Sequence, residues 1–336
     1  MTEKKSNVVY VPIVKSKGGE RWALSNLLPD TKPRVRPVIE LHAHKTKVFN
    51  EHLEDLCEEW AEALATNRFY LDGIWLHHEA GDPSILNRIF ARARAHGLRA
   101  LPVIRPTFST GSLHRVRDIV AEDGRGYLIR ATPEEIADEA QIERILDSVG
   151  LPCAKVDLLL DYRGRSMSLH EEVASIAHLS EWRRFIAASG VFPRSVADMT
   201  LTMWQNVERS DWTSWQEGIA SRLPRDPVYG DYVTRAPGAP AGGGNPPVHL
   251  RYTADDVWAV RVDGRHQDGD AVEMHNICES LIEQPFFRGA EFSAGDMEIV
   301  RTANPDEGPG GPMQWLQWCV SHHLEQVVDQ LTSVVA

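Results

Sequence analysis

Short runs of apolar and β-branched residues recur along the chain, and segments with a helical spacing of apolar residues separate most of them. One such segment places Leu53, Leu56, Cys57, Trp60 and Leu64 on a single helix face. The chain therefore alternates between expected strands and expected helices. We expect the strands at Val8–Val14, Val35–Leu41, Phe69–Leu76, Leu98–Ile104, Gly126–Arg130, Lys155–Asp161, Val196–Met203 and Val228–Thr234.

The spacing of these strands predicts the fold class. Their centres follow one another at roughly thirty residues, which is the length of a βα unit, and alternating strands and helices imply a parallel sheet. Eight units favour an α/β protein with a (β/α)8, TIM-barrel-like fold. A doubly wound open sheet stays the alternative, although the segment Lys15–Glu20 after the first strand lacks a Gly-rich nucleotide fingerprint.

The length of 336 residues permits two domains of ordinary size or one large core. Because the βα pattern is continuous, we expect one barrel-like domain over residues 1–336. A Pro/Gly run predicts a flexible loop at 235–248. We expect residues 249–336 to pack on the barrel as a C-terminal elaboration, with a strand or hairpin at His249–Val262, a helix near Asp270–Glu283 and a final helix from Met313 to Leu331.

Charge and cysteine usage exclude several classes of function. The chain has 36 Lys and Arg against 48 Asp and Glu, and the net charge of −12 opposes direct binding to nucleic acid or to an anionic membrane. The four cysteines lie far apart without a CxxC pair, so neither a disulfide framework nor a Cys-rich zinc site is indicated. No apolar run reaches the ~18 residues that a membrane span needs. We expect a cytoplasmic protein with reduced thiols.

Polar residues lie at or just after most of the predicted strands, which is where barrel enzymes carry their chemistry. We take Glu40, Asp161 and Asp231 as candidate catalytic residues. A barrel mouth that carries both cationic and anionic side chains suits an anionic small molecule, such as a phosphorylated or nucleotide-like ligand. Ordinary salt-bridge networks among the same residues are the competing interpretation. The candidate ligand-binding residues are Lys15, Lys17, Arg105, Arg130, Arg251, Tyr232 and Asp296.

Two histidines suggest a metal site. His42 and His44 form a His-x-His pair at a strand end, which is the first half of a metallohydrolase site because alternate strand residues share a face. Further ligands would come from Asp231 and the adjacent pair His77–His78, but later strand ends offer Arg130 and Asp161 instead of histidine. A metal-dependent hydrolase is therefore one alternative. Carboxylate oxygens would instead suit magnesium or calcium, so the only cofactor considered is a divalent cation.

Asp157 lies in the middle of a predicted strand, on the same face as Lys155 and Asp161. Because an unpaired buried carboxylate is costly, we expect Lys155 or an arginine to pair with it, or a polar barrel interior. In the last helix, Trp315, Trp318, Cys319 and His322 share one face, where His322 is expected to satisfy a core hydrogen bond. The tryptophans Trp204, Trp212 and Trp215 are either packed residues or interface anchors.

Nine segments, in order along nearly the whole chain, resemble the phage-associated "beta protein" family of bacterial and bacteriophage proteins. The resemblance implies a barrel-like α/β fold and a setting in phage or phage-defence gene neighbourhoods, and it implies no established reaction. His42–His44 departs from the mostly apolar, Pro-containing segment of the family. The matching segments are Val11–Glu20, Pro37–Glu40, Asp157–Asp161, Gly230–Tyr232, Leu250–Thr253, Trp258, Phe287–Asp296, Trp315 and His322–Leu324.

Two functional hypotheses follow. In the first, the protein is an enzyme or ligand sensor whose charged barrel mouth binds a small molecule. In the second, it is a non-catalytic scaffold or antitoxin-like protein whose acidic surface and tryptophans bind another defence protein. Whether the protein is an enzyme stays open at this point.

Overall fold

The computed structural model describes residues 7–42, 49–64, 67–73, 84–238, 247–265 and 271–335. By their internal contacts the residues form two compact units. The first comprises Met1–Ser16, Pro33–Ser189 and Ser214–Asp231, and the second comprises Lys17–Lys32, Gly190–Thr213 and Tyr232–Ala336.

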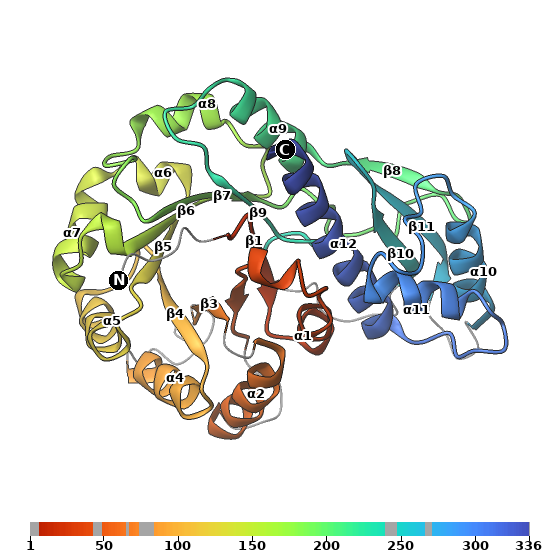
Figure 1. Ribbon diagram of the computed structural model, residues 1–336, viewed down its shortest axis with the longest axis horizontal. Helices are drawn as coiled ribbons and strands as arrows, with labels where there is room; N and C mark the ends of the chain where they lie inside the picture. Colours follow the sequence, from red (N-terminus) through yellow and green to blue (C-terminus); the bar gives the residue numbers. More distant parts are fainter. Residues whose placement is uncertain are drawn as a thin grey trace. The chain divides into compact units, whose positions relative to one another are not determined.

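The first unit is a closed barrel of eight parallel strands, in the order β1-β2-β3-β4-β5-β6-β7-β9 (Figure 1). The TIM-barrel-like fold predicted from the strand spacing is therefore confirmed. The strands are β1 (Tyr10–Lys15), β2 (Val38–Glu40), β3 (Arg68–Asp72), β4 (Arg99–Ile104), β5 (Tyr127–Ala131), β6 (Val156–Arg163), β7 (Arg184–Ser189) and β9 (Val228–Asp231).

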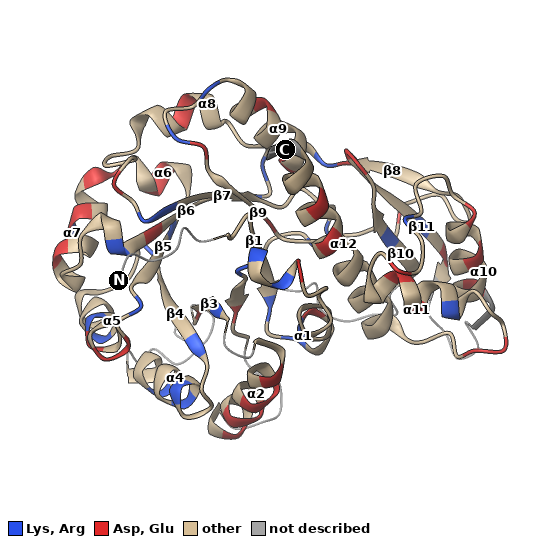
Figure 2. Ribbon diagram, in the orientation of Figure 1, with Lys and Arg blue, Asp and Glu red and all other residues tan. Residues whose placement is uncertain are grey.

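Helices surround the strands of the first unit in Figure 1. The buried face of α2 contains the five residues that the helical spacing predicted. Side-chain caps begin three of these helices: Ser109 caps α5, Thr132 caps α6 and Asp138 caps α7. Figure 2 shows acidic residues along α2 and α7 and basic residues along α4. The helices are α2 (Phe49–Leu64), α4 (Ser84–Ala95), α5 (Thr110–Asp123), α6 (Pro133–Ile136), α7 (Glu139–Val149) and α8 (Leu169–Glu172), with 3-10 turns at Lys32–Arg34, Cys153–Lys155 and Val173–Ser175.

The prediction of the seventh barrel strand is wrong. That strand is β7, whose residues are all buried between β6 and β9. The predicted segment Val196–Met203 contributes one isolated bridge, from Leu201 to Val262, and Leu201 and Met203 are more than half exposed. The two alanines of β7 give it a weak hydrophobic signal, whereas the larger apolar residues of Val196–Met203 imitate a strand.

The second unit contains an antiparallel sheet in the order β10-β11-β8. The predicted hairpin and final helix are confirmed, but β10 begins at Pro247, inside the predicted loop 235–248, of which residues 239–246 lie outside the described part. The elements are β8 (Gln205–Glu208), β10 (Pro247–Thr253), β11 (Val257–Arg265), α1 (Gly18–Ser25), α10 (Ala271–Ile282), α11 (Ala294–Thr302) and α12 (Pro312–Val335); α9 (Ser210–Ala220) begins in this unit and ends in the first.

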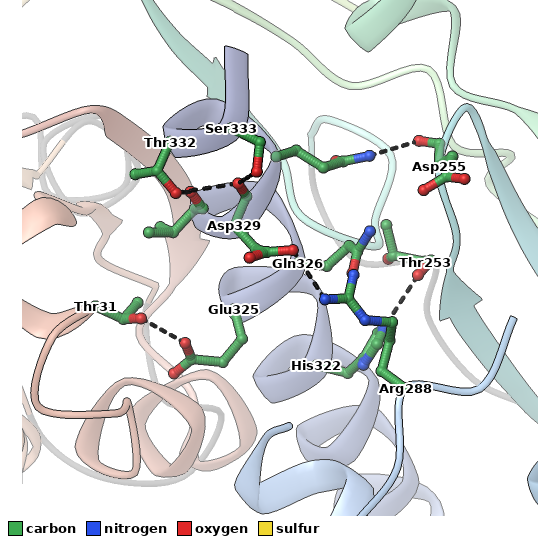
Figure 3. Close-up of polar contacts among 12 residues, drawn as sticks. Thr31, Thr253, Asp255, Arg288, His322, Glu325, Gln326, Asp329, Thr332 and Ser333 are labelled. Carbon is green, nitrogen blue, oxygen red and sulfur yellow. Dashed lines mark hydrogen bonds and ion pairs between the residues drawn. The ribbon is translucent and has the colours of Figure 1, made fainter. Parts of the chain in front are cut away.

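Helix α12 is held by polar contacts along its second half (Figure 3). The Glu325 carboxylate accepts hydrogen bonds from the Leu28 N–H, at 2.8 Å, and from the Thr31 hydroxyl, at 2.5 Å. Arg288 donates to Gln326 and pairs with Asp329. These contacts fix the helix within the second unit. No helix in the described ranges combines the length and the apolarity that a membrane crossing requires.

Candidate functional site

The register of the parallel strands places three charged residues in one layer at the carboxyl ends of β1, β2 and β3. Lys15 pairs in register with Glu40, and Glu40 pairs with Asp72. Register partners in adjacent strands point to the same face of a sheet. All three side chains are at most 5% exposed, so they form a buried layer at the end of the barrel where catalytic groups are found in this fold.

Arg130, near the end of β5, connects this layer to β6. Its Nε lies 2.8 Å from an oxygen of Asp161, and its Nη1 lies 2.9 Å from oxygens of both Glu40 and Asp72. Arg105, just after β4, donates through Nη2 to the same Asp72 oxygen at 2.8 Å. Five of the side chains are thus joined by charge-assisted hydrogen bonds. We call the set Lys15, Glu40, Asp72, Arg105, Arg130 and Asp161 the mouth cluster.

The mouth cluster balances three cations against three carboxylates, so it is formally neutral. Burying six charges costs free energy that their mutual attraction only partly repays. One donor of the cluster is not used: the Nε of Arg105 is buried and has no hydrogen-bond partner among the described residues. The cluster therefore offers an oriented guanidinium N–H to a ligand, next to carboxylates that can accept protons or hydroxyl hydrogen bonds.

Asp231 does not join the mouth cluster. It shares one strand face with Tyr229, whose ring packs against Trp215 of α9, while Gly230 occupies the opposite face. The Asp231 carboxylate accepts a 2.5 Å hydrogen bond from the hydroxyl of Tyr10, which also stacks on Tyr229. Of the three candidate catalytic residues, the structure therefore brings Glu40 and Asp161 together on Arg130 and places Asp231 on the outer face of the barrel wall.

The other four candidate ligand-binding residues belong to the second unit. Lys17 is the N-cap residue of α1, and its side chain does not cap the helix. Tyr232 is buried with its ring against Gly190, where a Cβ would lie 2.6 Å from the ring. Arg251 lines a cavity described below, and Asp296 lies in a buried network.

The network around Asp296 uses the family-like motif residues of the second unit. Its carboxylate accepts hydrogen bonds from the hydroxyls of Tyr252 (2.9 Å) and Ser293 (2.6 Å) and from His322 Nδ1 (2.8 Å). His322 Nε2 donates to the carbonyl of Thr253, the contact drawn in Figure 3. His322 thus satisfies buried hydrogen bonds, as expected, and joins α12 to the open edge of β10.

The predicted histidine metal site lies mainly beyond the described residues, which include neither His44 nor His77–His78. His42 is described: its Nδ1 donates to the Glu40 carbonyl at 2.9 Å. Within the described ranges, the candidate metal cluster is a different one, formed by Glu139, Glu143 and His178 on the surface. His178 already contacts Glu143 and Glu181 there, which explains the clustering without an ion.

A second buried charge cluster lies at the opposite, amino-terminal end of the barrel strands. Asp157 is bound by Arg183 in a bidentate pair at 2.7 and 2.8 Å, by the Tyr70 hydroxyl at 2.7 Å and by Arg184 at 3.4 Å. Burial by itself would raise the pKa of Asp157, but these arginines and the Tyr70 hydrogen bond lower it. The arginine alternative for pairing Asp157 is therefore confirmed, while Lys155 is exposed.

The tryptophans mostly pack inside. Trp212 and Trp215 are buried, and Trp204 is partly buried with its Nε1 donating to Ser280. The four cysteines are buried free thiols, as expected. Burial raises the pKa of the Cys57 thiol to about 12, so it stays protonated near neutral pH.

Sequence reasoning missed Asp72 and Arg183. Asp72 lies within the apolar run Phe69–Leu76, which was assigned to one strand. A charged residue inside this run was the signal that the strand ends there. Arg183 precedes the strand that was misplaced, so its position at the barrel end could not be inferred. In the structure, Asp72 binds the guanidinium of Arg130, and Arg183 binds the carboxylate of Asp157.

Comparisons with known proteins did not identify a reaction. A family model described as Beta protein matches residues 10–329. No curated protein matches the chain at a significant level. Among solved structures, a mutant tryptophan synthase alpha-subunit from the hyperthermophile Pyrococcus furiosus is similar at 12% identity and TM-score 0.41, covering 68% of this chain and 87% of that chain. A candidate fructose-1,6-biphosphate aldolase from Coccidioides immitis is similar at 12% identity and TM-score 0.40, covering 97% of this chain and 92% of that chain.

Proposed function

The chain belongs to the Beta protein family, and from the geometry of its barrel we propose that the mouth cluster binds a small phosphorylated or nucleotide-like molecule as an enzyme or ligand sensor. The observation that carries the proposal is the buried, unused Nε of Arg105 beside Asp72. A buried donor without a partner costs about 1–3 kcal/mol, which a ligand oxyanion would recover.

Arg105 suits this role better than Arg130. Each of the three carboxylates Glu40, Asp72 and Asp161 accepts a hydrogen bond from Arg130, so this guanidinium is committed within the protein. Among the described residues Arg105 has a single carboxylate partner, and it is 15% exposed, so a ligand can reach it. Arg130 would act by orienting the carboxylates that face the ligand.

Glu40 and Asp161 are the residues that we propose for proton transfer or for binding ligand hydroxyls. Both side chains are fixed by the same guanidinium, at 2.9 and 2.8 Å, and a carboxylate held in one orientation makes a better general base than a mobile one. A divalent cation would add charge next to a bound phosphate, and the three carboxylates provide oxygen ligands of the type that magnesium uses.

Thermal stabilisation by candidate ligands tests the proposal. We expect a phosphorylated sugar or nucleotide, with or without magnesium, to raise the melting temperature of the wild-type protein; at 100 times its dissociation constant, a ligand adds about 2.7 kcal/mol to the free energy of unfolding. Replacing Arg105→Met should remove most of this stabilisation because the oxyanion loses its donor.

Arg99→Met provides the matched control. Arg99 begins the same strand, β4, at the opposite end of the barrel and is exposed, so its loss should leave ligand stabilisation unchanged. The proposal fails if no phosphorylated ligand stabilises the wild type, or if Arg105→Met responds to the ligand as the wild type does.

A role in phage defence is a second proposal, which the family resemblance supports. If the barrel mouth serves that role, phages should form plaques with lower efficiency on a bacterial host that expresses the wild-type protein. The Glu40→Gln variant, expressed at the same level, should not lower this efficiency. An equal efficiency of plating with and without the protein, over a panel of phages, would contradict the defence role.

Binding to a partner protein would use the exposed apolar side chains of Leu201 and Met203 rather than the buried tryptophans. Unchanged protection in a Leu201→Asp variant would argue against this partner-binding surface.

A further inference from the structure

The second unit contains a cavity of about 170 Å³ between β10 and the start of α12. Alternate residues of β10, Pro247, His249 and Arg251, line it, while Val248 and Leu250 point to the apolar core on the other face. Helix α12 supplies the opposite wall with Trp315, Leu316 and Cys319. The cavity therefore combines an arginine with an apolar wall.

Among the described residues, no carboxylate balances the charge of Arg251. Its Nε donates to His249 Nε2 at 3.1 Å, its Nη1 donates to the Thr234 carbonyl at 2.6 Å, and its guanidinium lies 4.6 Å from the ring centre of Phe192. Within the described part of the chain, none of these partners is anionic, and Nη2 makes no hydrogen bond. A partly buried cation with neutral partners and a spare donor is what a site for an anion requires.

The neighbouring groups set the charge of the cavity. Arg235, the second cation that lines it, is 3.2 Å from the carboxylate of Glu20. His249 is neutral, because burial and the charge of Arg251 lower its pKa to about 3. Cys319 is a neutral thiol, because burial raises its pKa to about 11. The two arginines and one carboxylate leave one positive charge.

The hydrogen bonds also fix how His249 is protonated. Its Nδ1 lies 2.7 Å from the Pro247 carbonyl, which can only accept, so Nδ1 carries the proton. Nε2 then has a free electron pair and accepts from Arg251. Because this arrangement uses both nitrogens, His249 positions the guanidinium and leaves Nη2 for a ligand.

We propose that this cavity binds a small monocarboxylate, whose anionic group pairs with Arg251 and whose apolar body lies against Trp315 and Leu316. A single negative charge neutralises the site, whereas a phosphate dianion would reverse its sign. The volume of the cavity also suits a small ligand, because a cavity of about 150 Å³ holds a benzene molecule and drug-sized ligands need roughly 300 Å³ or more. This site is separate from the one proposed at the barrel mouth.

Titration calorimetry of the full-length protein with benzoate tests the proposal. We expect saturable binding of one benzoate per chain, with weaker binding of phenyl phosphate and no binding of benzyl alcohol, which has a similar body without the charge. Arg251→Met should weaken benzoate binding by about tenfold or more, since a charge-assisted pair is lost.

Arg144→Met is the matched control, because Arg144 is also a partly buried arginine whose guanidinium donates to two backbone carbonyls. It should bind benzoate like the wild type, and so should Arg105→Met, which separates this site from the barrel mouth. If Arg251→Met does not fold, Leu316→Trp fills the cavity with the charge in place and should also weaken binding. Absence of benzoate binding to the wild type, tighter binding of phenyl phosphate, or unchanged binding in both Arg251→Met and Leu316→Trp would overturn the proposal.

Discussion

Replacing Asp157→Asn should lower the free energy of unfolding by about 3–5 kcal/mol, because removing one partner of a buried ion pair leaves the other charge uncompensated. Asp157 is fully buried and binds Arg183, Arg184 and the Tyr70 hydroxyl. Urea or guanidinium unfolding, followed by circular dichroism, measures the change. Asp157 lies at the amino-terminal end of the barrel, where buried groups serve stability rather than catalysis.

The effect should depend on pH with a defined sign. The Asp157 pKa is lowered in the folded state. The ionised carboxylate therefore stabilises the fold fully above its unfolded-state pKa, near 3.8, and this stabilisation is lost as the pH falls through the folded-state pKa. The difference between wild type and Asp157→Asn should therefore be constant near neutral pH and shrink in acid. Asp118→Asn makes the same chemical change in an exposed pair with Arg117 and should alter stability by at most about 0.5 kcal/mol. Equal effects of the two substitutions would contradict the assignment.

The sequence predicts the barrel because its information is repeated. Eight strands at similar spacing allow one to be misplaced, as β7 was, without changing the fold class. The alternation of β10 was also readable, since Val248 and Leu250 face the core while His249 and Arg251 do not. Local pattern alone therefore determined most of the elements.

The candidate site was less predictable because it depends on which face each strand turns inward. Asp231 ends a strand, as Glu40 does, yet the register places Gly230 on the face opposite to Asp231 and leaves the carboxylate with Tyr10 on the outer face. A shift of one residue in a strand exchanges its two faces. Strand ends were predicted to within a few residues, which is not sufficient to decide this.

The division of the candidate residues between two units was hidden for a different reason. Lys17 follows the barrel strand β1 closely in the chain, and Tyr232 follows β9, but both belong to the second unit. Chain proximity to a barrel strand therefore does not make a residue part of the barrel. Asp296, buried and accepting hydrogen bonds from Tyr252, Ser293 and His322, shows that a distinctive motif can maintain a core rather than a site.

Replacing Arg130→Met should have the second large effect, because it leaves the carboxylates of Glu40, Asp72 and Asp161 buried together without the cation that binds all three. We expect the free energy of unfolding to fall by about 3–5 kcal/mol near neutral pH. The measurement is denaturant unfolding near neutral pH, with circular dichroism to confirm the fold.

A double-mutant cycle with Asp161→Asn separates a direct interaction from general disruption. Asp161 lies 2.8 Å from Arg130, so the two substitutions together should cost less than the sum of their separate effects, by about 0.5–3 kcal/mol. Asp118→Asn, an exposed change on α5, should instead add to Arg130→Met without coupling. Additive effects of Arg130→Met and Asp161→Asn would mean that the guanidinium does not stabilise this carboxylate. In that case Arg130 could not position Asp161 for a ligand, and the role proposed for this pair at the barrel mouth would be lost.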